Sequence, residues 1–288
     1  MAATPLSIRP DAQVAHGSGP YCREVGEGTG VVCIHGNASS SAQWRALMDR
    51  LAPRHLVLAP DTHGAGKGPP WPQDRPLSLR DEVSLLAPVF LRAGTPFVLV
   101  GHSYGAAVAL LAALQHPGRV AALVLYEPTL FALVDAETPA PNAADGIRDT
   151  VARAAAALAA GDRGAAAEQF IDHWMGAGSW RAKPAVQRGA IEAAVVNIEG
   201  WSRALFDEAT PLGSFRRLAM PTLLMLGRET TASARAVADL LAQTLPHVES
   251  RAFDGLGHMG PVTHPEVVNP VIDDFLRRVV RPGLRIAA

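Results

Sequence analysis

The stretch over residues 96–111 constrains the fold most, because a short apolar run passes through Gly-His-Ser-Tyr-Gly directly into an alanine- and leucine-rich segment. This pattern predicts a strand, a very tight turn and a helix, with Ser103 at the apex of the turn. Glycines stand two positions before and after this serine, where a Cβ atom would clash in so sharp a turn. The N-terminus of the predicted helix directs N–H groups and its positive dipole end at the same point. We therefore expect Ser103 to act as a nucleophile.

Strand-like and helix-like segments alternate on both sides of this unit. Strand patterns occur at 21–25, 31–34, 55–59, 120–126, 222–227 and 248–253. Helical patterns occur between the strands at 42–51, 79–91, 233–245 and 265–280, and in one long insertion at 146–160, 165–175 and 183–206. Because parallel strands require crossover helices, the alternation predicts an α/β fold, a three-layer α/β/α sandwich around a mostly parallel sheet with an inserted helical cap. We assign residues 1–128 and 217–288 to the core and 129–216 to the cap.

The composition limits the classes of partner. With 288 residues, 48% of them hydrophobic and 18% charged, the chain can bury a large core. A net charge of −1 predicts no binding to nucleic acid or to an anionic membrane. No apolar run reaches the ~20 residues of a membrane span, and residues 1–20 lack the apolar core of a secretion signal, so we expect a cytoplasmic protein that acts on a small molecule. The sequence is compatible with a homo-oligomer. Cys22 and Cys33 are too few for a disulfide framework and are expected to be free.

A serine nucleophile needs a base, and His258 is the histidine best placed to supply it. It lies in the glycine-flanked loop 255–260 after the last strand, and catalytic groups gather beyond the carboxyl ends of parallel strands. His102 is adjacent to the serine. Neighbouring residues on a tight turn point in different directions, so we expect His102 to support the turn instead.

Two carboxylates are candidates for the acid that orients this base. Glu127 follows the strand at 120–126 directly, with a proline behind it, and Glu229 follows the strand at 222–227. We favour Glu127, because Glu229 reads equally well as an ordinary solvated carboxylate. Asp254 is close to His258 in sequence but leaves a strand, which is typical of a turn residue.

Negative charge that develops on a carbonyl oxygen must be met by donors held in place beforehand. The turn at the serine supplies one donor, the backbone N–H of Tyr104. The second is expected from the loop after the strand at 31–34, where we choose the backbone N–H of Asn37. Five residues are expected to contact the substrate: His35, Gly36, Phe131, Trp174 and Met259. Asp61 and His63 lack a third ligand at suitable spacing, so no metal site is predicted.

Several motifs in this chain together resemble the α/β-hydrolase superfamily, over residues 21–280. They run from Cys33 to Asn37, Ala59 to Gly66, Gly101 to Gly105, Pro221 to Gly227 and Gly257 to Met259. The resemblance implies that Ser103 is the nucleophile, that His258 is the base and that Asn37 and Tyr104 are the oxyanion donors.

The chain departs from the commonest pattern of that superfamily at Thr230, where an acid would be expected. The segment from Tyr126 to Pro128 resembles instead the haloalkane dehalogenases, which carry their acid after the earlier strand. Those enzymes use an aspartate nucleophile, so the serine at position 103 argues against dehalogenation and for an acyl-serine route.

We therefore expect a serine hydrolase that cleaves an ester-like bond of a small, largely apolar substrate through an acyl-enzyme on Ser103, with no cofactor. Lactonase, thioesterase, amidase, C–C bond hydrolase and cofactor-free perhydrolase activities would use the same triad, so they remain alternatives. A ligand receptor with the hydrolase fold and little turnover is an alternative from another class.

Overall fold

The computed structural model describes residues 19–280. The polar composition of residues 1–19 predicts a loose arm, and nearly all of that segment lies outside the described residues. Seven strands form one sheet in the order β1-β3-β2-β4-β5-β6-β7. β1 is antiparallel to β3, and the other neighbouring strands run parallel, which confirms the mostly parallel sheet. The strands are β1 (Cys22–Val25), β2 (Thr29–Ile34), β3 (His55–Pro60), β4 (Phe97–His102), β5 (Val120–Tyr126), β6 (Thr222–Gly227) and β7 (Val248–Phe253).

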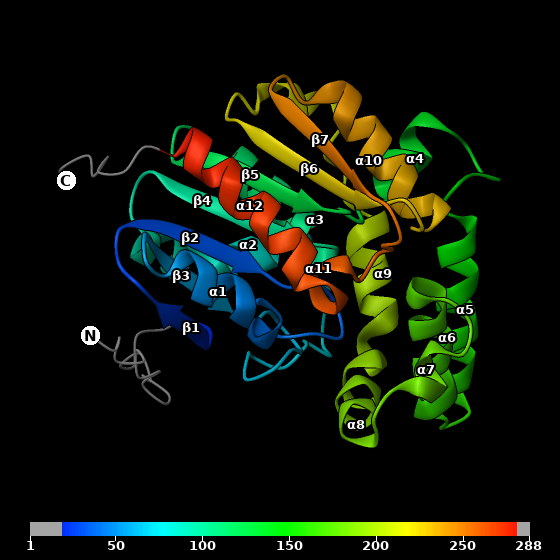
Figure 1. The fold of residues 1–288 in the computed structure, drawn as a ribbon. Coiled ribbons are helices and arrows are strands. Elements are labelled where there is room, and N and C mark those ends of the chain that lie inside the picture. Colours follow the sequence, from blue (N-terminus) through cyan, green and yellow to red (C-terminus); the bar gives the residue numbers. More distant parts are fainter. Residues whose placement is uncertain (1–18, 281–288) are drawn as a thin grey trace.

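Helices cover both faces of this sheet (Figure 1). In the central strand β4, Val98 and Val100 belong to one buried apolar cluster, and Leu99 belongs to another on the opposite face. Successive side chains of a strand point to opposite faces, so a continuous apolar run buries both and confirms the three-layer sandwich. The first face is covered by α1 (Arg45–Leu51), which follows the short helix η1 (Ser41–Trp44), and by α12 (Pro265–Val279); the second is covered by α2 (Leu79–Ala93), α3 (Tyr104–Gln115) and α10 (Ala232–Thr244).

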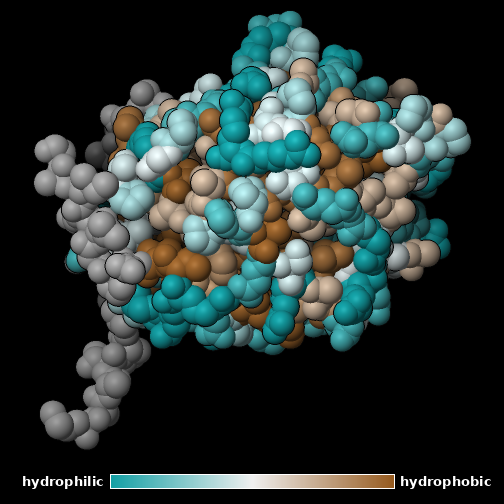
Figure 2. Space-filling view, turned by 90° about the horizontal axis from the view of Figure 1, so that it is seen from above, coloured by the Kyte–Doolittle hydropathy of each residue, from teal (hydrophilic) through white to brown (hydrophobic). Residues whose placement is uncertain are grey.

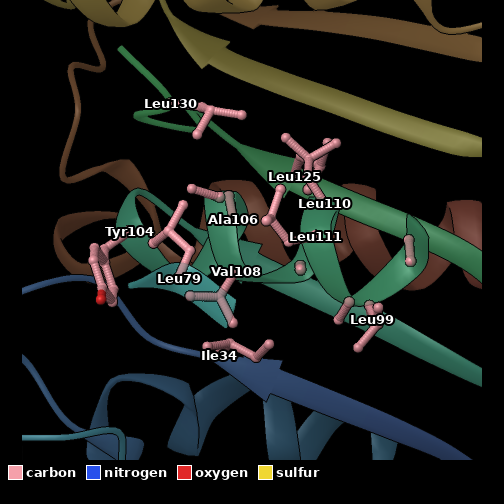
Figure 3. Packing of buried hydrophobic residues seen from close by; sticks show 14 of the residues in the cluster. Ile34, Leu79, Leu99, Tyr104, Ala106, Val108, Leu110, Leu111, Leu125 and Leu130 are labelled. Atoms are coloured by element: carbon pink, nitrogen blue, oxygen red, sulfur yellow. The ribbon is translucent and has the colours of Figure 1, made fainter. Parts of the chain in front are cut away.

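The helix α3 is buried on all sides. Every residue from 104 to 113 is buried, and their small or aliphatic side chains fill the space between the sheet, α2 and the segment before β6. Figure 3 shows Val108, Leu110 and Leu111 spread around this helix, with Ile34 and Leu125 on either side in this view. A helix without a polar face is stable only inside a core, so the position of Ser103 at its N-terminus is rigidly held.

The chain between β5 and β6 consists of loops and helices, and we call the helices from α4 to η3 the cap helices. Figure 1 shows α5 to α9 standing beyond the carboxyl ends of the parallel strands. The helical stretch expected at 183–206 is in fact three elements, because the poor helix formers Val195, Val196 and Asn197 form a 3₁₀ turn. The boundaries at 128/129 and 216/217 stay a prediction. The cap helices are α4 (Ala132–Glu137), α5 (Asp145–Ala159), α6 (Arg163–Met175), α7 (Ser179–Ala182), α8 (Ala185–Ala194), η2 (Val195–Asn197), α9 (Ile198–Phe206) and η3 (Leu212–Arg217).

Hydrophobic and hydrophilic residues are interspersed over the surface seen in Figure 2. The large exposed apolar side chains are scattered over different elements, for example Leu91 on α2, Val186 on α8 and Val267 on α12. Within residues 19–280, every helix is too short or too polar to cross a membrane. Both cysteines are free thiols, as predicted, and burial raises the pKa of Cys22 to about 12 and that of Cys33 further.

Candidate active site

Ser103 lies in the sharp turn between β4 and α3, with φ 57° and ψ −121°. This left-handed conformation is strained for a residue with a side chain. The glycines on either side allow it. A Cβ on Gly101 would lie 2.5 Å from Cα of Ala106, and a Cβ on Gly105 would lie 2.2 Å from the carbonyl oxygen of Ile34. Close packing of the strand, the turn and the neighbouring strand therefore holds the serine hydroxyl at the carboxyl end of the sheet.

His258 reaches this serine from the loop after β7. Its Nε2 lies 2.9 Å from Ser103 Oγ, and its Nδ1 lies 2.6 Å from Glu127 Oε2. Since a carboxylate accepts hydrogen bonds, Nδ1 carries the proton, and Nε2 is free to accept from the serine hydroxyl. All three side chains are buried. The arrangement can pass a proton from the serine to the imidazole and stabilise the imidazolium that results.

Glu127 is the carboxylate that the structure brings to His258. It follows β5 with φ 46° and is fully buried. Besides the imidazole, it accepts hydrogen bonds from the backbone N–H of Gly227 at 2.7 Å and from the hydroxyl of Thr230 at 2.5 Å. Three donors therefore compensate for the removal of this carboxylate from water. Thr230, the position where an acid was expected, supports the acid instead.

Glu229 and Asp254 lie away from this arrangement. The side chain of Glu229 is exposed, and within the described residues it forms no hydrogen bond or ion pair. Its backbone N–H donates to the carbonyl of Leu256 and so helps to shape the His258 loop. Asp254 is exposed and pairs with Arg228 at 2.6 Å. Of the two carboxylates that the sequence left as alternatives, Glu127 therefore lies next to His258 and Glu229 does not.

The loop after β2 places Asn37 beside the serine. Asn37 and Ser103 line the same cavity, and Tyr104 is the first residue of α3, whose N–H has no partner inside the helix. A Cβ on Gly36 would lie 3.2 Å from Cβ of Ser103, so only a glycine lets the loop approach this closely without displacing its neighbours. The backbone N–H groups of Asn37 and Tyr104 stay the predicted oxyanion donors.

His35 is buried behind this loop and does not line the cavity. Its Nδ1 donates to the carbonyl of Gly36 at 2.8 Å, and its Nε2 accepts from the N–H of Thr62 at 3.3 Å. Burial lowers its pKa. Because Nε2 accepts a hydrogen bond, the ring is neutral in this arrangement. His35 shapes the loop that bears Asn37, and the structure gives it no place for direct contact with a substrate in the cavity.

The cavity next to Ser103 is small and mainly apolar. Its volume is about 30 Å³, enough for one or two water molecules. Most of its wall comes from the cap helices α5, α6 and α9, which contribute Ile147, Val151, Phe170, Trp174, Ile198, Trp201, Ser202 and Leu205. The rest of the wall consists of Asn37, Ser103, Thr129 and Phe131.

Trp174 also packs directly on His258. The two rings are stacked at a centroid distance of 3.9 Å with an angle of 26° between their planes. The adjacent His173 lies edge-on to Trp174, and burial, with a smaller effect from His258, lowers its pKa to about 4. The cap therefore covers one face of the imidazole whose edges bind the serine and the glutamate.

The predicted substrate contacts divide into two groups. Phe131 and Trp174 line the cavity, whereas His35, Gly36 and Met259 do not belong to its wall. Sequence reasoning left out the aliphatic part of the wall, although the helical spacing of Ile147 and Val151, or of Ile198, Trp201 and Leu205, marks one face of a helix. That spacing predicts a buried face but not which partner it meets.

The pair Asp61 and His63 takes part in structural contacts. Asp61 accepts from the backbone N–H groups of Ser41 and Lys67, which braces the loop after β3. Nδ1 of His63 lies 2.9 Å from Oε2 of Glu82, a buried carboxylate on α2. Residues 19–280 contain no group of three or more His, Cys, Asp or Glu side chains placed to hold a metal ion.

A family model described as alpha/beta hydrolase fold matches residues 30–265. A pimeloyl-[acyl-carrier protein] methyl ester esterase of Aeromonas hydrophila is 27% identical over 271 residues, which cover 87% of this chain and 96% of that protein. Lipase LipV of Mycobacterium tuberculosis is 30% identical over 257 residues, covering 84% and 91%. The solved structure of a thermophilic esterase from Thermogutta terrifontis superimposes with a TM-score of 0.70 and 25% identity, over 90% of this chain and 93% of that one. Because the match extends from β2 to the start of α12, the chain belongs to the α/β-hydrolase fold family, as an enzyme related to esterases and lipases.

Proposed function

We propose that the protein is a serine hydrolase that cleaves an ester-like bond of a small, largely apolar substrate through an acyl-enzyme on Ser103. The observation that carries the proposal is the continuous line from Glu127 through His258 to the serine hydroxyl, with distances of 2.6 and 2.9 Å. Nucleophile, base and orienting acid are then all within hydrogen-bond reach.

The first half of the reaction forms the acyl-enzyme. His258 Nε2 takes the proton of Ser103 as Oγ attacks the carbonyl carbon, and the carbonyl electron pair moves onto oxygen. The N–H groups of Asn37 and Tyr104 bind that oxyanion. When the intermediate collapses, His258 gives its proton to the departing alkoxide, and the alcohol leaves.

The second half returns the enzyme to its resting state. Water attacks the acyl carbon while His258 takes its proton, and a second oxyanion forms at the same donors. Collapse breaks the bond to Ser103 Oγ, which regains the proton from His258, and the carboxylic acid leaves. Glu127 holds Nδ1–H throughout and stabilises the imidazolium in both halves.

The wall of the cavity supports an uncharged substrate. Its cap side is formed, apart from Ser202, by aliphatic and aromatic side chains, and a charged group there would lose its hydration without an oppositely charged partner. The volume of about 30 Å³ means that cap side chains must move apart to admit an acyl or alkyl group. The esterase and the lipase among the relatives support cleavage of an ester bond.

The test is hydrolysis of p-nitrophenyl acetate and butyrate, combined with labelling by a fluorophosphonate. We expect turnover and labelling of Ser103 in the native chain and neither in Ser103→Ala. Saturable binding of the ester without turnover in the native chain would point to the ligand receptor. Turnover that survives in Ser103→Ala would refute the acyl-serine route.

A further inference from the structure

His102, the residue before the serine, is a buried histidine to which the reaction above assigns no role. It is 1% exposed. Its Nε2 lies 2.8 Å from the backbone carbonyl oxygen of His258, and its Nδ1 lies 3.0 Å from the side-chain Nε2 of Gln43. Both ring nitrogens are therefore engaged, one of them on the backbone of the residue that faces the serine.

These contacts determine where the protons lie. A carbonyl oxygen can only accept, so Nε2 of His102 must donate to His258. Nδ1 is then the acceptor of a neutral ring, and the group of Gln43 that faces it must be the amide NH₂. Burial, together with the proximity of His258, lowers the pKa of His102 to about 3, so this neutral form persists across the pH range of an esterase assay.

Gln43 extends the connection to the other side of the cavity. Its Oε1 accepts from the backbone N–H of Gly36 at 3.4 Å, and Gly36 directly precedes Asn37. A Cβ on Gly36 would lie 3.2 Å from Nδ1 of His102, so the loop and the ring are also in close packing. One hydrogen-bonded line thus runs from the loop after β2, through Gln43 and His102, to the backbone of His258.

Other hydrogen bonds hold the loop that bears His258 at neighbouring positions. The hydroxyl of Tyr126 donates to the carbonyl of Gly257 at 2.9 Å, and the N–H of Glu229 donates to the carbonyl of Leu256 at 3.0 Å. His102 is the member of this set that binds the carbonyl of His258 itself. A displacement of that carbonyl moves Cα of His258 and with it the imidazole edge that must meet the serine.

The geometry points to His102 and Gln43 as positioning residues, which hold the backbone of His258 and the Gly36–Asn37 loop at a fixed separation so that base and oxyanion donors act on the same carbonyl group. The catalytic consequence rests on the proposed function, but the positioning itself does not. Small displacements matter, because an error of ~1 Å in the placement of a reacting group can cost about 100-fold in rate.

A matched pair of substitutions at His102 tests this inference. Glutamine places an amide NH₂ at the reach of imidazole Nε2 and can keep the bond to the His258 carbonyl, whereas asparagine reaches only to the Nδ1 position. We expect His102→Asn to lower kcat by about 10- to 100-fold with KM changed by less than about twofold, and His102→Gln to keep kcat within about fivefold of the native value. Equal kcat values in the two variants, or a native kcat in His102→Asn, would overturn the assignment.

A second readout does not depend on any substrate. The proton on Nδ1 of His258, shared with Glu127, gives a downfield signal in proton NMR that reports the placement of this ring. We expect the signal to shift or broaden in His102→Asn and to be kept in His102→Gln. If the native chain hydrolyses no ester, the proposed function fails, and the NMR comparison still decides the positioning role. An unchanged signal in both variants would refute it.

A substitution of Gln43 tests the inference even if a His102 variant does not fold. Gln43→Leu keeps the approximate volume but removes both hydrogen bonds, and we expect kcat to fall by about 3- to 10-fold with the same NMR change in weaker form. Gln115→Leu, the same change at an exposed position at the end of α3, is the control and should leave both readouts at native values. A Gln43→Leu variant indistinguishable from this control would exclude the proposed line.

Discussion

The two sides of the cavity are built on different principles. On the core side, the functional groups of Ser103, His258 and Glu127 lie beyond strand ends that the sheet aligns, and each is held by hydrogen bonds. On the cap side, the wall consists, apart from Ser202, of aliphatic and aromatic side chains from α5, α6 and α9, which are held by packing. Directional bonds fix atoms to fractions of an ångström, whereas apolar packing tolerates exchange of side chains of similar volume. We therefore expect the core side to determine the rate of chemistry and the cap side to determine which substrates enter.

The largest expected effect is on the core side. Ser103→Ala removes the nucleophile, and kcat should fall by about 10⁴- to 10⁶-fold, because the triad acts as one unit. The measurement is p-nitrophenyl butyrate hydrolysis at saturating substrate, with thermal melting to establish that the variant folds. A fall smaller than tenfold would mean that the groups of the core side do not determine the rate of the chemistry.

The second prediction separates the two carboxylates. Glu127→Gln leaves the shape but offers an amide to Nδ1 of His258, so the wrong tautomer is favoured and kcat should fall by about 10⁴-fold. Glu229→Gln, at an exposed position, is the matched control and should stay within about twofold of the native rate. The reverse ranking of these two variants would assign the orienting acid to Glu229.

The third prediction concerns the cap. Trp174→Ala should enlarge the cavity next to His258 and raise kcat/KM for longer acyl chains relative to acetate by about 10-fold, with a smaller change in kcat for acetate. Trp180→Ala provides the control, since Trp180 is also buried among the cap helices but does not belong to the wall of the cavity. Both variants should lose stability, but only Trp174→Ala should change selectivity. An equal shift in selectivity from both would show that cap stability, and not the wall, sets the preference.

The smallest expected effect is on the pH dependence of the free energy of unfolding. It compares a buried histidine of the core, His102, with one of the cap, His173. The pKa of His102 is lowered to about 3 and that of His173 to about 4, in both cases mainly by burial. The unfolded chain binds protons near pH 6.5, so the free energy of unfolding is highest above that pH and decreases as the pH falls toward the two lowered values. Each ring should contribute a slope of about 1.4 kcal/mol per pH unit in that window.

Urea denaturation between pH 4 and pH 7 measures this contribution. His102→Gln and His173→Gln should each give a shallower fall of stability with decreasing pH than the native chain. The contribution of His173 should flatten toward pH 4, whereas that of His102 should keep its full slope down to pH 4. Slopes in both variants that equal the native slope would mean that neither buried ring gains a proton on unfolding.

More of the core than of the cap could be predicted from the sequence. The bounds of β5 and β6 are those expected from their apolar runs, because a strand buried on both faces needs a continuous run and ends where polar or glycine residues begin. β7 also has the expected bounds, although most of its residues are exposed. The cap was recognised as helical, but its break at 195–197 and the face of each helix that meets the cavity were not, since helical periodicity indicates a buried face without naming its neighbour.

The amino-acid sequence alone determined the α/β sandwich, the strained turn at Ser103 and the short set of residues that could converge on it, because strand–turn–helix patterns and glycine spacing are local properties of the chain. Only the tertiary structure decided that Glu127 and not Glu229 meets His258, that Thr230 donates to Glu127, and that Trp174 covers the imidazole. It also revealed the hydrogen-bonded line from Gln43 through His102 to His258, in which His102 lies 59 positions after Gln43 and 156 positions before His258. Such contacts depend on how distant segments pack, and no local pattern specifies the distance between two side chains that only the folded sheet brings together.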